Sequence, residues 1–171
     1  MAGVSTLTDT AIVQREPEPT VAVRIQQPMD QLDLAGAFGR YLPMVASRVE
    51  AEGGTISGPS FGRYHRFGPD VVDVEIGFPV ERPPEGLPAL GTVEPGEVGV
   101  SELPGGPVAR TIHLGPYDGL PAAYDALHEW IHAQPGYDDS VGAWESYVDD
   151  PGSTDDVATL RTEIVWPLVE E

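Results

Sequence analysis

Apolar residues recur at helical spacing in two stretches of the chain. The first stretch, 33–52, predicts a helix whose apolar face comprises Leu34, Phe38, Tyr41, Leu42, Val45 and Val49. Pro43 lies inside it and is expected to kink the helix or to belong to its first turn, because proline lacks a backbone donor. The second helix is expected to follow Asp118 as its N-cap, with Pro121 in its first turn and a buried stripe of Leu120, Tyr124, Leu127 and Ile131.

Four other stretches alternate between apolar and polar residues or are rich in β-branched residues. They are 60–67, 71–80, 142–148 and 158–166, and this pattern is typical of strands. Between the second and third of them, residues 81–97 contain many prolines and glycines, which predicts an exposed crossover.

These elements occur in the same order twice because the sequence repeats itself. Residues 13–32 align with residues 100–119 without a gap, FGRY (61–64) corresponds to WESY (144–147), and VEIGFPV (74–80) corresponds to TEIVWPL (162–168). We therefore predict an α+β fold of duplicated β-α-β-β units with pseudo-twofold symmetry, in which an antiparallel sheet carries its helices on one face. A ligand groove is expected between the halves.

The repeat also predicts the domain organisation. We expect a flexible N-terminus over residues 1–10, followed by a single domain over residues 11–171. Within that domain, repeat one extends over about residues 11–80, the crossover over 81–97, and repeat two over about residues 98–171.

The charge of the chain narrows the choice of partners. Its 28 acidic residues outnumber its 9 basic residues, all of them arginines, and the net charge is -19. Such a chain repels phosphate backbones and anionic membranes, so we expect no direct binding to nucleic acid or membrane. There is no cysteine and no spanning apolar run, and the first residues, MAGVSTLTDT, lack the basic and apolar regions of a secretion signal. We therefore expect a cytoplasmic protein without disulfides or a secretion signal.

One motif in the second helix matches a metal-binding signature. His128 and His132 flank Glu129 in the pattern H-E-x-x-H, which in some enzymes holds zinc. On a helical wheel, however, Glu129 points away from the buried stripe, and no histidine follows His132 as a third ligand. We therefore expect a solvated helix face and neither a metal nor another cofactor.

Two glutamates, Glu145 and Glu163, lie in apolar strands next to tryptophans. Burial of an unpaired acid is costly, so each glutamate either meets solvent or an arginine such as Arg161, or forms a partly buried carboxylate in an aromatic pocket. Such a carboxylate can neutralise a lipophilic cation or, with a raised pKa, act as a general base on water. Glu145 has Gly62 as its counterpart in the first repeat, which argues against a symmetric framework role.

Five segments carry a resemblance to a known family. They are PMDQL…AFGRYLP, FGRYHRFGPDVVDVEIGFPV, HLGPYDGLPAAYDALHEWI, WESYVDDP and TEIVWPL, and they extend over most of the chain from residue 11. In this order they resemble the GyrI-like effector-binding family. The resemblance implies a duplicated β-α-β-β fold whose groove is lined by aromatic residues around a central glutamate and accepts bulky aromatic, often cationic compounds.

On this chain the resemblance assigns the acids to Glu145 and Glu163, with Glu163 slightly preferred because its strand is more apolar. The wall residues that it implies are Phe38, Tyr41, Phe61, Tyr64, Tyr117, Tyr124, Trp144, Tyr147 and Trp166. Among these, Phe38 and Tyr124 are the first that we expect to belong to the core, because aromatic residues at helical spacing usually pack there.

Three functions follow from the sequence and the resemblance. The first is a binding module for small hydrophobic or cationic aromatic ligands. The second is a hydrolase of cyclopropane-bearing antibiotics, in which Glu145 or Glu163 deprotonates water and Tyr147 stabilises the phenolate that develops. The third is an inhibitor that acts on a protein partner, DNA gyrase. A monomer and a homodimer are both compatible with the sequence.

Overall fold

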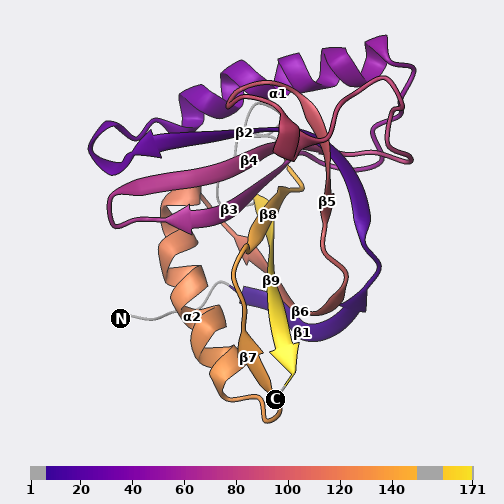
Figure 1. Cartoon of the computed structure of the whole chain (residues 1–171). Helices are drawn as coiled ribbons and strands as arrows, with labels where there is room; N and C mark the ends of the chain where they lie inside the picture. The colour runs from indigo at the N-terminus through magenta and orange to yellow at the C-terminus, as the bar shows by residue number, and fades with distance from the viewer. Residues whose placement is uncertain (1–6, 150–159, 171) are drawn as a thin grey trace. The chain divides into compact units, whose positions relative to one another are not determined.

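The structure is a computed structural model that describes residues 7–149 and 160–170 (Figure 1). The chain divides into two compact units, which we call unit 1 (residues up to 15, and from 106 onward) and unit 2 (residues 16–105). Within each unit, antiparallel strands form a sheet with a helix packed on one face. The predicted α+β class and the duplication are therefore confirmed.

Unit 2 contains β2 (Glu18–Pro28), α1 (Leu34–Ala51), β3 (Phe61–Phe67), β4 (Val71–Pro79) and β5 (Gly99–Leu103). The strands lie in the order β3-β4-β2-β5. Helix α1 packs through Val45 and Val49 on a core that includes Val23, Val74 and Ile76. Pro43 lies in the interior of α1 rather than in its first turn.

Unit 1 contains β1 (Leu7–Arg15), β6 (Gly106–Leu114), α2 (Leu120–His132), β7 (Tyr137–Asp139), β8 (Trp144–Tyr147) and β9 (Arg161–Glu170). The strands β1, β6 and β9 are neighbours, and both β7 and β8 pair with β9, at different places along it. Helix α2 packs through Ala123, Leu127 and Ile131 on Ile164 and Leu168 of β9.

The first strand of each repeat pairs with the second strand of the other repeat. Strand β1 pairs with β6, with Val13 opposite Val108, and β5 pairs with β2, with Val100 opposite Val21. Residues 7–10, expected in the flexible N-terminus, lie in β1; residues 1–6 are outside the described residues.

The start of α2 differs from the sequence prediction. Asp118 lies in a single 3-10 turn, Tyr117–Gly119, and Gly119 is the N-cap, without a side-chain hydrogen bond. The prediction that Asp118 is the N-cap was therefore wrong, because the 3-10 turn leads directly into α2 and moves the N-cap to Gly119. Pro121 lies in the first turn of α2 as predicted. Neither helix of the described residues has the length and apolarity needed to cross a membrane.

Candidate functional site

Strand β8 places Glu145 on the face of the unit 1 sheet that α2 covers. Side chains alternate between the two faces of a strand, and Glu145 is opposite Ile164, a residue of the core beneath α2. Tyr147 and Trp166 lie on this face as well, because each is two residues from one member of that pair. Trp144 points to the opposite face and is fully buried there.

The carboxylate of Glu145 is buried and is held by two tyrosine hydroxyls. Tyr124 of α2 donates a hydrogen bond of 2.8 Å to Oε2, and Tyr147 donates one of 2.9 Å to Oε1. Only 5% of Glu145 is exposed. Burial raises the pKa of Glu145, and the two hydroxyls oppose this effect because they stabilise the charged form.

Aromatic rings surround this carboxylate. The ring of Tyr124 meets that of Trp166 edge to face at 5.9 Å, and the ring of Tyr147 meets that of Tyr117 at 5.8 Å. Their residues are partly buried or, for Tyr117, at the surface. We call Glu145, Tyr117, Tyr124, Tyr147 and Trp166 the Glu145 cluster.

A buried hydroxyl lies next to the cluster. Thr162 is directly opposite Tyr147 in the β8–β9 pair and therefore shares its face. It is fully buried, and its Oγ1 has no hydrogen-bond partner within the described part of the chain. Buried polar atoms normally have a partner, so a water molecule or a ligand atom that reached this hydroxyl would supply the missing hydrogen bond.

Glu163 lies on the opposite face of the sheet from Glu145, so the structure does not bring the two expected acids together. Its Oε1 is 3.1 Å from Nη2 of Arg15, and its Oε2 is 2.9 Å from Nη2 of Arg110. Glu163 is thus neutralised by two arginines of its own unit, and Arg161, which was considered as a partner, pairs with Asp149 instead.

The same arrangement occurs in unit 2. Glu75, the counterpart of Glu163 in the first repeat, is buried, hydrogen-bonds to His65 and lies 4.0 Å from Nη1 of Arg63. The acid that occurs in both repeats therefore has a basic partner in both. By contrast, no arginine or histidine forms an ion pair with Glu145 among the residues of unit 1 that the structure describes.

The other expected wall residues are placed in unit 2. Phe38, Tyr41 and Tyr64 pack against the core beneath α1, and Phe61 is fully buried. Two cavities, of about 260 and 440 Å³, also belong to unit 2 and lie outside the Glu145 cluster.

Tyr124 has a double role that sequence reasoning missed. Its ring packs against the core of unit 1, as expected, but its hydroxyl reaches Glu145. The sequence indicated this role only through the position of Tyr124 at the edge of the apolar stripe of α2, from which its hydroxyl can extend beyond the core.

Solved structures with the same fold include EcmrR, which was solved in complex with DNA, and two further proteins. The EcmrR C-terminal domain is 24% identical, the alignment covers 96% of this chain and 99% of that domain, and the TM-score is 0.76. In the EcmrR–DNA complex the TM-score is 0.75 at 24% identity, and the alignment covers 97% of this chain but only 59% of the EcmrR chain. The chain thus corresponds to part of that regulator.

The two other structures are more distant in sequence. SAV2435, solved bound to tetraphenylphosphonium, is 14% identical with a TM-score of 0.64, over 95% of this chain and 94% of that one. A hydrolase from Listeria innocua is 12% identical with a TM-score of 0.63, over 94% of this chain and 91% of that one. At these identities the likeness shows the fold alone.

The amino-acid sequence matches a known family of domains. No curated protein matches the chain. The family model of the GyrI-like small molecule binding domain matches residues 8–169, which is nearly the whole chain. The chain therefore belongs to the GyrI-like family of small-molecule binding domains.

Proposed function

We propose that the chain binds lipophilic aromatic cations at the Glu145 cluster. The observation that carries the proposal is a buried carboxylate that is held by two tyrosine hydroxyls and has no basic partner among the described residues of its own unit. The other two conspicuous acids, Glu75 and Glu163, are already paired with arginine.

A bound cation supplies the charge that Glu145 lacks. An opposite charge within about 4–6 Å favours the ionised form of a carboxyl group, so a bound cation lowers the raised pKa of Glu145. The rings of Tyr124, Tyr147 and Trp166 add cation–π attraction and apolar contact. The net charge of -19 further attracts cations toward the protein.

The ligand reaches Glu145 by displacing tyrosine side chains. Tyr117, with 36% of its surface exposed, and the partly buried Tyr147 form the accessible edge of the cluster. A tyrosine side chain has two χ angles and rotates as a unit about them. Displacement of Tyr117 and Tyr147 exposes both the Glu145 carboxylate and the neighbouring hydroxyl of Thr162. The structure of SAV2435 with tetraphenylphosphonium provides a ligand of this chemistry on the same fold.

The test is a titration of the chain with tetraphenylphosphonium and with tetraphenylborate, followed by tryptophan fluorescence with correction for inner-filter absorption. The two ions have the same shape and opposite charge. We expect saturable binding of the cation and binding of the anion weaker by at least about 10-fold, which corresponds to about 1.4 kcal/mol. Equal affinity for both ions would refute a site built on a carboxylate, and saturation by neither would refute the proposed binding function.

Hydrolysis is the second candidate, and the same carboxylate favours it. In this reaction Glu145 takes a proton from water, the hydroxide forms a C–O bond to a cyclopropane carbon, and the ring C–C bond breaks. The electron pair released enters the conjugated system of the substrate as a phenolate, toward which the Tyr147 hydroxyl donates a hydrogen bond. A hydrolysed product that forms with the wild type and is absent with Glu145→Gln would support this function; its absence with both would exclude it.

A further inference from the structure

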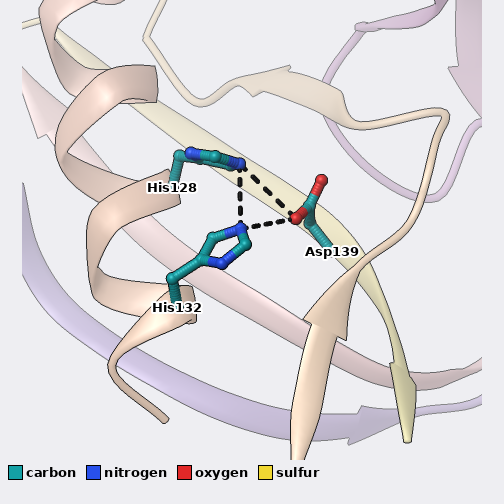
Figure 2. Close-up of side chains that lie close together, drawn as sticks. All are labelled: His128, His132 and Asp139. Atoms are coloured by element: carbon teal, nitrogen blue, oxygen red, sulfur yellow. Dashed lines mark hydrogen bonds and ion pairs between the residues drawn. The ribbon is translucent and has the colours of Figure 1, made fainter. Parts of the chain in front are cut away.

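We propose that His128, His132 and Asp139 form a binding site for a divalent transition metal ion, with Zn²⁺ as the representative ion. The three side chains come from two elements of unit 1, α2 and β7, and Figure 2 shows them pointing toward one another. This inference is independent of the function proposed for the Glu145 cluster.

The potential ligand atoms converge on one point. Nε2 of His132 lies 3.0 Å from Nε2 of His128 and 2.8 Å from Oδ1 of Asp139, and the third side of the triangle measures 3.4 Å. Zinc binds histidine nitrogen and carboxylate oxygen at about 2.0–2.2 Å, so tetrahedral ligands lie about 3.3 Å apart. The triangle therefore needs only a slight expansion to admit the ion.

Ordinary two-centre hydrogen bonds cannot join all three atoms of this triangle. Each Nε2 carries at most one hydrogen, and ionised Asp139 is only an acceptor. If both imidazoles donate to Asp139, the two N–H groups face each other at 3.0 Å, and if His128 donates to His132, then His132 presents a lone pair to the carboxylate. If His132 alone donates, its single hydrogen is shared between His128 and Asp139 in a three-centre bond. A cation at the centre accepts electron pairs from all three atoms at once.

The local structure fixes all three ligands. Residues four apart lie on the same face of a helix, so the last turns of α2 place both histidines side by side. Strand β7 pairs with β9, with Asp139 opposite Leu168, and Leu168 belongs to the core on which α2 packs. The ring of His128 also lies 5.5 Å from the ring of Trp166, which restrains its orientation.

The donor set indicates the class of ion. Two imidazole nitrogens and one carboxylate oxygen suit zinc and its neighbours in the first transition series, whereas magnesium and calcium prefer oxygen ligands only. Three protein ligands leave a coordination position open to water or to a donor atom of another molecule. The site differs from that of the H-E-x-x-H enzymes, because its third ligand is an aspartate seven residues after His132.

The exposed position of the histidines makes the site accessible to free metal ions. About half of each histidine side chain is exposed, compared with 26% of the Asp139 side chain. Asp138 lies 3.8 Å from Nε2 of His132 and accepts a hydrogen bond from the backbone N–H of Asp139, so it orients the ligand-bearing turn and adds negative charge.

The test is a calorimetric titration of the full chain, without a histidine tag, with Zn²⁺ in excess Mg²⁺. We expect one Zn²⁺ per chain and an increase in Tm. His132→Ala and Asp139→Asn are each expected to lower the affinity by at least about 10-fold. Glu129→Gln is the matched control, because it removes one negative charge, as Asp139→Asn does, from an exposed position of the helix that carries the two histidines, and it is expected to change the affinity less than about 2-fold.

Absorption spectra with Co²⁺ in place of Zn²⁺ provide a second readout, since nitrogen and oxygen ligands of low coordination number intensify the d–d bands. These bands are expected in the wild type and in Glu129→Gln and should be lost in His132→Ala. The proposal would be overturned by an unchanged Zn²⁺ affinity in His132→Ala, by equal weakening in Glu129→Gln and Asp139→Asn, or by the lack of saturable binding up to millimolar Zn²⁺.

Discussion

Glu145→Gln is expected to weaken binding of tetraphenylphosphonium by about 10–100-fold, or about 1.4–2.8 kcal/mol. Glutamine keeps the size of the side chain and an oxygen that can accept a tyrosine hydrogen bond, but it removes the charge. In a buried site a charge–charge attraction is weakly screened, so the loss is larger than at a surface. Isothermal titration calorimetry on both proteins measures this difference.

Glu163→Gln is the matched control for this experiment. The substitution is chemically identical and lies in the neighbouring strand, but Glu163 is on the opposite face and already neutralised by Arg15 and Arg110. We expect its affinity for the cation to stay within about 3-fold of the wild type. If Glu163→Gln weakened binding as much as Glu145→Gln, the assignment of the site to one carboxylate would be wrong.

The same two substitutions are expected to change stability in opposite directions. At pH 7.5, Glu145→Gln should raise the free energy of unfolding by about 1–2 kcal/mol, because it removes the cost of a buried carboxylate that has no basic partner among the described residues of unit 1. Glu163→Gln should lower it by about 1–2 kcal/mol, because two partly buried arginines lose their common acid. Urea unfolding of the wild type and both variants gives these values.

The effect of Glu145→Gln on the free energy of unfolding is expected to depend on pH with a definite sign. Burial raises the pKa of Glu145 in the folded state, so in the pH range above the ordinary carboxyl value the folded state binds more protons than the unfolded state. The contribution of Glu145 to stability therefore falls as the pH rises from that value through the folded-state pKa. The difference in the free energy of unfolding between Glu145→Gln and the wild type should therefore increase over the same pH range. A difference that stays constant or decreases there would contradict the raised pKa.

Much of the fold could be predicted because its signals are local. The apolar face of α1, from Leu34 to Val49, and the alternation in β4 each lie within a single segment. The pairing of β1 with β6 rather than with the strands of its own repeat could not be predicted. Both repeats have the same apolar pattern, so Val13 has equally suitable partners in each, and the choice depends on the tertiary structure.

The candidate site was predicted only in part, because the partners of its acids also depend on the tertiary structure. Both glutamates lie in an apolar strand that also contains a tryptophan, and the sequence favoured Glu163. The partners of Glu163 are Arg15 and Arg110, which come from distant strands, and only the strand register brings them to it. The missing counterpart of Glu145 in the first repeat was the more informative signal.

Asp139 illustrates the same limit for the proposed metal site. The H-E-x-x-H motif predicts a third ligand after His132, and no histidine follows His132 in the sequence. The structure instead brings an aspartate to the two histidines, because the chain turns back after α2 and enters β7. Aspartate is an ordinary zinc ligand. The H-E-x-x-H pattern does not specify an aspartate at this spacing, so the sequence alone does not indicate Asp139 as a ligand.

The most direct test of the account is the pKa of the Glu145 carboxyl group, measured by NMR from the pH dependence of its ¹³C shift, with Glu145→Gln to assign the signal. We expect a pKa above the ordinary glutamate range in the free protein and a lower pKa with saturating tetraphenylphosphonium. An ordinary pKa in the free protein, or one that the cation leaves unchanged, would contradict the claim that Glu145 is the buried counter-charge for the ligand.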